Sequence, residues 1–451
     1  MDKNQDLFEH KRISSAVFEL AIPAVISQII TVVYNMADTY FIGQINDPNQ
    51  VAAASIILPV YMVITGFANL FGIGGASLVA RSLGRGDKDR VKHITSFSVW
   101  AGILSALIYS LVLYLFNRPL LLFAGANDAT LDFCYKYIFW TVIVGSVPTL
   151  LTSLLSHLVR AEGYSRAASF GIAMGGVLNI VLDPIFILVL KYDIEGAAIA
   201  TFLSNLTSAL YYLIYIAIKR SKLMLSLDPR NISLKGKIPA EVITVGLPSL
   251  VIIFLSVFAN VMINKFMSLY SNEAIAGVGI AKKVDSLMYA VSNGIAQGVL
   301  PLIAYNYSSG NIPRMKEAIK KTLLISFGIT TLGTAIIYFG STYIVRSFID
   351  DPVTVMYGSR FQKTMCMAGP CTAITMVTIT VFQAVGYKIR SLILTICRKG
   401  GLDVPFMAIF NSLFGVFGIV YATPAADICA MCASIIMLLS FWKKLSKKMT
   451  D

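Results

Sequence analysis

Two aspartates, Asp38 and Asp183, lie within long apolar segments of the chain. If these segments cross a bilayer, each ionised carboxylate costs about 2.5–3.5 kcal/mol at the centre, so its presence there indicates a function. No lysine or arginine falls in the membrane interior of the first half of the chain. We therefore expect a mobile cation or a proton to neutralise these two carboxylates.

Polar residues spaced by one helical turn accompany Asp183. Asn179 precedes it by four residues, so both side chains leave the same face of a helix. Pro184 follows directly and cannot donate a backbone hydrogen bond, which frees a carbonyl one turn earlier. In the next apolar segment, Thr201 and Asn205 are again one turn apart. Together these side chains predict an oxygen-rich cation site.

Either Na⁺ or a proton fits this predicted site. Hard cations prefer oxygen ligands, and two neighbouring carboxylates also retain a proton because their like charges repel. Taken singly, the amides and hydroxyls are typical of hydrogen bonds that hold helices together, so the unpaired carboxylates carry the functional interpretation. We assign the site to Asp38, Asn179, Asp183 and Thr201, with Asn35 and Asn205 in support. No cofactor is expected besides the coupling ion.

The second half of the chain differs because its apolar segments contain charges of both signs. These charges are Lys265, Lys282, Lys283, Arg398, Lys399, Asp285, Asp403 and Asp427. Asp285 closely follows Lys282 and Lys283. Asp403 follows Lys399 by four residues, a spacing that favours ion pairs. We expect most of these charges to pair structurally, whereas Lys283 and Asp285 could instead face a central cavity and contact substrate.

Apolar segments of membrane-spanning length recur along the whole chain. Hydrophobic residues make up 56% of it and charged residues only 14%, against about a quarter in soluble domains. A transmembrane helix needs about 20 mainly apolar residues. The segments are continuous rather than alternating, which favours helices over a barrel. The sequence predicts an all-α integral membrane protein with twelve transmembrane helices at 17–41, 51–80, 94–116, 134–158, 167–190, 195–218, 239–268, 274–304, 318–343, 361–383, 390–412 and 415–442.

The two halves of the chain share one pattern. Pro23 aligns with Pro248 in the first segment of each half, and Thr201 aligns with Thr423 in the sixth. The motif LDP at Asp183 resembles LDVP in the second half. Each half has six segments and enters from the same side, as in transporters built from parallel repeats with a site between them. We predict two pseudo-symmetric six-helix lobes, an N-lobe at 1–218 and a C-lobe at 239–451, joined by a cytoplasmic linker at 219–238.

The net charge of +13 is distributed asymmetrically. Lysines and arginines concentrate in alternate connections, at 81–92, 219–237, 314–321 and 443–448. Because basic residues favour the cytoplasmic side, we place both termini in the cytoplasm and the chain in the cell inner (plasma) membrane. The positive charge is therefore explained by the orientation of the chain in the membrane, and nucleic acid is not an expected partner. The expected surroundings are the lipid bilayer, and we expect a monomer.

Several stretches of the chain together resemble the multidrug and toxic compound extrusion (MATE) family. They are NMADTYFIG in the first segment, the loop SLVARSLGRGD, the turn RAEG, NIVLDP in the fifth segment, EGAAIATFLSN in the sixth, and PLIAYNYSSGN in the second half. The similarity spans essentially the whole chain and looks greatest to the bacterial DinF/MepA-like branch. It implies a V-shaped, two-lobed cation/drug antiporter.

The resemblance also implies roles for individual residues. The cation site of such relatives corresponds to Asp38, Asn179, Asp183 and Thr201. Another branch has an essential glutamate in helix 7, where this chain has Ser256, which argues against that branch's second-lobe site. Asp403 departs from the apolar residue usual in the DinF/MepA-like branch.

The expected function is secondary active multidrug efflux, with Na⁺ or H⁺ exchanged for amphipathic or cationic organic molecules by alternating access. One alternative is a flippase or exporter of lipid-linked saccharides, which predicts a strongly cationic cavity and is kept open by the basic residues of the second half. An ion channel is another. An enzyme is not expected, because the three histidines and the remaining sequence form no HExxH motif, nucleophile elbow or phosphate loop.

Overall fold

The computed structural model describes residues 3–45, 47–234 and 236–450 of the chain. All regular secondary structure in these ranges is helical, which confirms the predicted fold class. Lys235 of the predicted linker lies outside the described residues, as do residues 1–2 and 451 at the ends of the predicted lobes.

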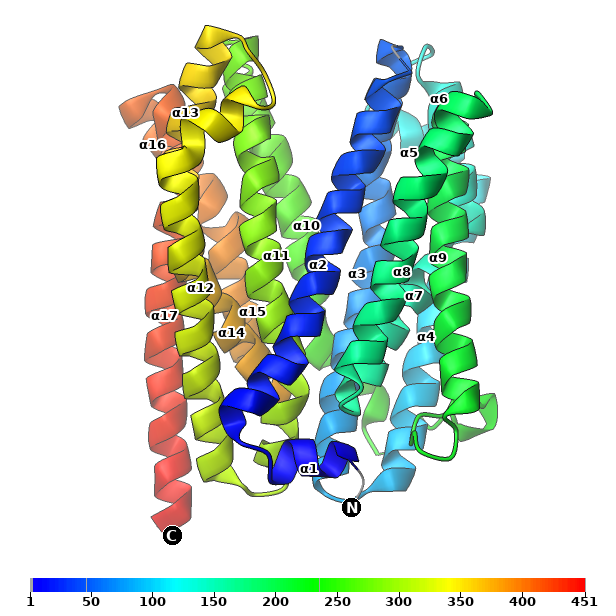
Figure 1. The fold of residues 1–451 in the computed structure, drawn as a ribbon, viewed down its shortest axis with the longest axis vertical. Coiled ribbons are helices and arrows are strands. Elements are labelled where there is room, and N and C mark those ends of the chain that lie inside the picture. Colours follow the sequence, from blue (N-terminus) through cyan, green and yellow to red (C-terminus); the bar gives the residue numbers. More distant parts are fainter. Residues whose placement is uncertain (1–2, 46, 235, 451) are drawn as a thin grey trace.

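The first half of the chain forms one helical bundle, drawn on the right of Figure 1. Its helices are α1 (Lys3–Glu9), α2 (Ile13–Gly43), α3 (Pro48–Gly84), α4 (Lys88–Leu115), α5 (Asn117–Phe123), α6 (Leu131–Ile138), α7 (Ser146–Ala161), α8 (Ser165–Pro184) and α9 (Asp193–Ile218). Two π-helical segments, η1 (Phe139–Val144) and η2 (Ile185–Val189), follow α6 and α8. Pro184 ends α8 where η2 begins, so the helix changes its winding directly after Asp183.

The second half forms the other bundle, on the left of Figure 1. Its helices are α10 (Ile238–Met267), α11 (Asn272–Ser308), α12 (Ile312–Arg346), α13 (Pro352–Cys366), α14 (Gly369–Val385), α15 (Lys388–Ile396), α16 (Asp403–Phe414) and α17 (Val416–Thr450). The π-helical segment η4 (Cys397–Gly401) joins α15 to α16. Inside it Lys399 and Gly400 leave the helical backbone, with φ/ψ of −127°/129° and 80°/−48°.

Most of the predicted membrane spans are continuous helices, and three are interrupted. Nine helices in the described ranges are long and apolar enough to cross a membrane. The predicted spans 134–158 and 361–383 are pairs of helices bent by 51° and 43°. The predicted span 390–412 is α15 and α16 with the break between them. Interruptions inside a membrane are tolerated where the freed backbone is buried in protein or lines a cavity.

The two bundles meet at the end that holds both termini and diverge toward the opposite end, while α2 crosses between them (Figure 1). Glycines allow the helix backbones to touch at this junction. A Cβ at Gly246 of α10 would lie 1.8 Å from the Leu70 carbonyl oxygen of α3, and one at Gly298 of α11 would lie 2.7 Å from that of Leu20 in α2. Small residues permit such contact between helices in lipid.

Side chains also join the two bundles at this end. The Ser77 hydroxyl of α3 donates a 2.6 Å hydrogen bond to the backbone carbonyl of Gln383 in α14. Arg314 of α12 donates to the carbonyl oxygens of Phe8 and Lys11, each at 2.6 Å. Phe8 of α1 stacks on Tyr305 of α11 with ring centroids 5.0 Å apart. The short helix α1 therefore fastens the start of the first bundle to the second.

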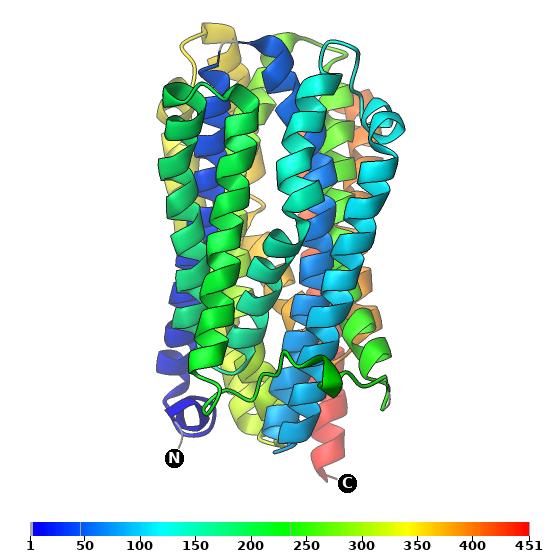
Figure 2. The ribbon, with the colours of Figure 1, turned by 90° about the vertical axis from the view of Figure 1, so that its right-hand side faces the viewer.

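The connection between the bundles runs along the outside of the first one (Figure 2). Thr95 and Ser96 of α4 both donate to the carbonyl of Ser226, at 3.1 and 3.0 Å. The Trp100 indole donates to the carbonyl of Leu227 at 3.0 Å. These contacts hold the connection to α4 instead of leaving it as a free tether.

Candidate functional site

The polar residues predicted on α8 and α9 lie together in the first bundle. The Asn179 amide nitrogen donates to the Asp183 carboxylate at 3.2 Å and to the Thr201 hydroxyl at 3.4 Å. Asp183 has no exposed surface, and Asn179 has 1%. The side chain of Asn179 thus joins one turn of α8 to α9 inside the bundle.

Asp38 of α2 approaches this group from the other side. Its carboxylate is close enough to Asp183 for the two charges to interact, and it accepts a hydrogen bond from the Tyr137 hydroxyl of α6. Both carboxylates also act electrostatically on Tyr34 of α2. The helices α2, α6, α8 and α9 therefore place their polar groups around one point.

Sequence reasoning missed the tyrosines of this site. Tyr34 precedes Asp38 by four residues, so the spacing of one helical turn was a usable signal. The hydroxyl of Tyr61, on α3, accepts a 3.4 Å hydrogen bond from Asn205. Tyr137 and Tyr61 come from segments distant in sequence, and nothing in the spacing connects them to Asp38.

The two supporting asparagines are placed differently. Asn205 donates to the backbone carbonyl of Thr201 at 3.0 Å and so borders the cluster. Asn35 lies on α2 with an exposed side chain, and the contacts described for the cluster do not include it. The structure thus brings Asn205, but not Asn35, into contact with the predicted site.

Three oxygen atoms of this cluster are buried without a hydrogen-bond partner in the described part of the chain. They are Oδ1 of Asp38, Oδ2 of Asp183 and Oδ1 of Asn179. Buried polar atoms are nearly always satisfied, so an unsatisfied group points to a bound water or ion. Within the described ranges no lysine or arginine forms an ion pair with either aspartate. Oxygen donors with an uncompensated negative charge suit a monovalent cation or a proton.

The charges of the second bundle form a different arrangement. Arg398 and Asp427 form a buried ion pair with Nε and Oδ1 3.0 Å apart, and the Lys399 ammonium lies 3.6 Å from Asp403. Thr372 donates to Asp427 at 2.9 Å. Structural pairing is therefore observed for Lys399 and Asp403, as their spacing predicted.

Asp285 does not pair with its sequence neighbours as the spacing suggested. None of the ion pairs found in the described residues joins Asp285 to Lys282 or Lys283. Asp285 interacts electrostatically with Lys399 and Arg398, and also with Lys282 without forming an ion pair. Lys283 is exposed on α11.

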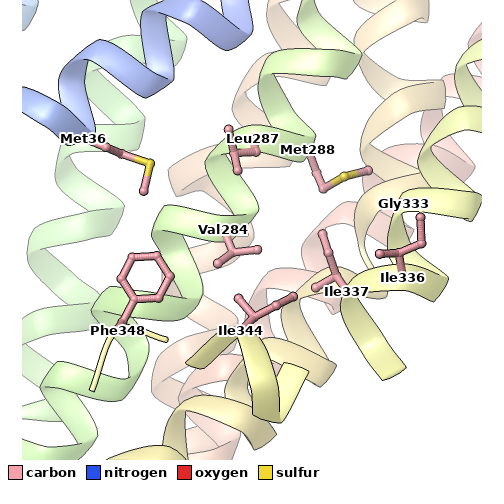
Figure 3. Close-up of a pocket in the computed structure, with 9 residues that line it drawn as sticks. All are labelled: Met36, Val284, Leu287, Met288, Gly333, Ile336, Ile337, Ile344 and Phe348. Atoms are coloured by element: carbon pink, nitrogen blue, oxygen red, sulfur yellow. The ribbon is translucent and has the colours of Figure 1, made fainter. Parts of the chain in front are cut away.

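An apolar cavity of about 400 Å³ lies where α2 meets the second bundle (Figure 3). Met36 reaches into it from α2, and the other side chains come from α11, α12 and the residues just after α12. The lining residues are Met36, Val284, Leu287, Met288, Gly333, Ile336, Ile337, Ile344 and Phe348. Lys283 and Asp285 flank the lining residue Val284 in sequence but do not themselves line this cavity.

The cavity and the carboxylate cluster share one helix. Met36 in the cavity lining lies two residues before Asp38, so α2 connects the two sites. Methionine side chains are flexible and polarisable and adapt to ligands of different shape. A movement of α2 would therefore act on both sites at once.

Comparison with known proteins gives a consistent result. The MatE family model matches residues 23–185 and 248–409, one match in each half. Multidrug export protein MepA of Staphylococcus aureus strain N315 is 30% identical over 441 residues, which are 97% of this chain and 96% of that protein. A solved structure described as the outward-facing conformation of a multidrug resistance MATE family transporter of the MOP superfamily is 25% identical. It has a TM-score of 0.90 and covers 98% of this chain and 99% of that one. A crystal structure of MATE in complex with MaL6 has a TM-score of 0.92 at 24% identity and covers 98% and 100%.

Proposed function

Because this chain belongs to the MATE family of multi-pass membrane transporters, we propose that it is a secondary active multidrug exporter that exchanges Na⁺ or H⁺ for amphipathic or cationic organic molecules. The relative MepA is named a multidrug export protein, and transport rather than catalysis is the activity of such relatives. The coupling ion binds in the N-lobe, the substrate binds between the lobes, and α2 links the two.

The observation that carries this proposal is the set of unsatisfied oxygens around Asp38 and Asp183. Asp183 is fully buried and Asp38 is half-buried, and their carboxylates interact without a paired lysine or arginine in the described ranges. Binding of a positive charge between them is therefore favourable. Asn179 and Thr201 supply further oxygen atoms at the same point. A mobile cation fits this chemistry, and its movement down its own electrochemical gradient would supply the driving force for export.

The apolar cavity supports an organic substrate. Its lining of aliphatic, methionine and phenylalanine side chains favours the hydrophobic part of an amphipathic molecule. No residue of the lining carries a fixed charge. Substrate binding therefore depends on contacts with flexible apolar side chains, which accept molecules of different shape, as expected of a multidrug carrier. The positive part of a drug would then extend out of the cavity into the space between the lobes.

Alternating access accounts for the arrangement of the lobes. We propose that residues 1–218 and 239–451 move against each other, with both termini in the cytoplasm of the cell inner membrane. In this orientation the junction of Ser77 with Gln383 closes the cytoplasmic side, and the diverging ends open outward. Coupling requires that the cation and the drug each bind the two states with different affinity. The transporter would act as a monomer in the lipid bilayer.

The flippase alternative receives less support. A carrier of lipid-linked saccharides should present basic residues to its cavity. Here Arg398 and Lys399 are engaged by Asp427 and Asp403 within the C-lobe, and the described cavity is apolar. Drug export is therefore the better-supported function.

Replacement of Asp183 with Asn tests the proposal. D183N keeps the shape of the side chain and removes its charge, so it should abolish ethidium efflux driven by an imposed ion gradient. The measurement uses right-side-out vesicles loaded with ethidium under separate Na⁺ and H⁺ gradients, which also identifies the coupling ion. A matched control is D132N, because Asp132 is exposed and pairs only with Lys136 across one turn in the described structure. Wild-type efflux by D183N at normal expression would remove this carboxylate from the mechanism.

A further inference from the structure

The C-lobe repeats part of the geometry of the N-lobe site. The sequence repeat aligns Asp183 with Asp403 and Thr201 with Thr423. In the structure the Thr423 hydroxyl of α17 donates to the Asp403 carboxylate of α16 at 3.3 Å. In the N-lobe the completely buried Asp183 is linked to Thr201 through Asn179. In the C-lobe the completely buried Asp403 is bonded to Thr423 directly. The second carboxylate oxygen of Asp403, Oδ2, has no hydrogen-bond partner in the described structure, and neither does Oδ2 of Asp183.

The two sites differ at the residue four positions before the aspartate. That residue is Asn179 in the N-lobe and Lys399 in the C-lobe. The Asn179 amide bonds Asp183 along a continuous helix, α8. At Lys399 the helix is broken, and the ammonium lies 3.6 Å from Oδ2 of Asp403, the oxygen that lacks a hydrogen bond. In the C-lobe the Lys399 ammonium thus lies beside the carboxylate. In the N-lobe the proposed mobile ion would take the corresponding position.

The charge balance of the two lobes agrees with this difference. The N-lobe site contains two carboxylates and no basic side chain paired with them in the described ranges. The C-lobe cluster contains three basic and three acidic side chains in mutual electrostatic contact, and is neutral. They are Lys282, Arg398, Lys399, Asp285, Asp403 and Asp427. Removal of one lysine from this cluster would leave a net negative charge in a buried place.

We propose that the C-lobe contains a second copy of the monovalent-cation site, which the tethered ammonium of Lys399 occupies permanently. The proposal rests on the proposed cation site of the N-lobe for its chemistry. It assigns the coupling ion to the N-lobe alone, since the C-lobe site carries its own cation. The broken helix serves this purpose, because an extended backbone at Lys399 lets the long side chain turn back onto Asp403.

The site is also built to hold a cation when the lysine is absent. Asp403 begins α16, and a carboxylate at a helix N-terminus is stabilised in its charged form by the helix dipole. Thr423 adds a hydroxyl oxygen. Replacement of Lys399 by asparagine would remove the ammonium and leave the oxygens of Asp403 and Thr423 to a mobile cation. The prediction is a gain of binding, which a purely structural ion pair does not give.

The experiment is Na⁺ binding by purified full-length protein carrying K399N in a D183N background. D183N disables the N-lobe site, so that any saturable binding of radioactive Na⁺ arises from the C-lobe. We expect K399N/D183N to bind Na⁺ saturably and to gain thermal stability with NaCl but not with choline chloride. D183N alone should show neither effect. A third substitution, D403N, should remove the gain from K399N/D183N.

K265N/D183N is the matched charge control, because Lys265 lies exposed on α10 outside the cluster. Folded K399N/D183N that binds no more Na⁺ than this control would overturn the proposal. K399Q/D183N carries the same expectation and replaces K399N should the latter not be recovered as folded protein. Failure of D183N to impair efflux would count against the proposed function, and absence of the gained Na⁺ binding would count against the C-lobe site.

Discussion

The Asn179 amide donates to the carboxylate of Asp183, one helical turn away, at 3.2 Å. The same nitrogen reaches Thr201 on the neighbouring helix, while the amide oxygen of Asn179 is buried without a partner in the described structure. The amide is thus oriented by its donors and presents its oxygen to the space near the carboxylates. Asn179 therefore positions Asp183, and under the proposed function its free oxygen would be a ligand of the coupling ion.

Replacement of Asn179 with Leu should weaken cation binding without leaving a cavity in the core. A hydrogen bond to a charged group contributes about 1.5–3 kcal/mol, so the ion concentration for half-maximal efflux should rise by about 10- to 100-fold. The measurement is ethidium efflux from vesicles over a series of concentrations of the coupling ion. N35L is the control on α2, because Asn35 is exposed. An unchanged ion dependence in N179L would assign Asn179 a packing role only.

Enlargement of Gly333 should restrict the apolar cavity. A Cβ at this position would already lie 2.5 Å from the terminal methyl carbon of Met288, so a leucine must fill the space beside it. Overpacking costs about 1–3 kcal/mol, and we expect G333L to raise the KM for bulky drugs about tenfold while smaller substrates are less affected. Transport of a size series of organic cations measures this. G328L is the matched control on α12, since a Cβ at Gly328 meets no atom within 4 Å. Equal KM changes in both variants would refute the cavity as a substrate site.

Loss of Arg314 should loosen α1 from the second bundle. Its guanidinium donates to the carbonyls of Leu7, Phe8 and Lys11, and R314A leaves all three without this donor. Because the side chain is only partly buried, we expect a modest effect, about tenfold faster amide exchange around residues 6–9. Hydrogen exchange read by mass spectrometry tests this, with K320A on the exposed face of α12 as the control. Exchange that is unchanged in R314A would show that the Phe8–Tyr305 stack and the hydrogen bond from Asn306 to the Phe8 carbonyl hold α1 without Arg314.

The helical architecture follows from features that are local in the sequence. A run of about 20 apolar residues must close its own backbone hydrogen bonds in lipid, so length and composition suffice to locate most spans. The repeat of Pro23 with Pro248 and of Thr201 with Thr423 is likewise visible without a structure. The broken helix at Lys399 was not predicted, although Gly400 and Gly401 follow it directly, because the apolar residues on both sides read as one span.

The composition of the N-lobe cluster could be predicted only in part. Asn179 and Asp183 are related by one helical turn, and the spacing alone places them on one face. Tyr137 and Tyr61 join the same site from α6 and α3, because those helices pack beside α2 and α9. Their participation depends on the rotation of whole helices about their axes, which no local pattern encodes.

The amino-acid sequence by itself determined that this chain consists of apolar helices in two related halves, and that two carboxylates in the first half lack a basic neighbour. Only the tertiary structure decided which charges meet. Asp285 interacts electrostatically with Lys399 and Arg398, which are distant in sequence, as well as with its neighbour Lys282. The physical reason is that hydropathy and helical period are properties of neighbours along the chain, whereas an ion pair depends on distances between helices, which are set when side chains pack.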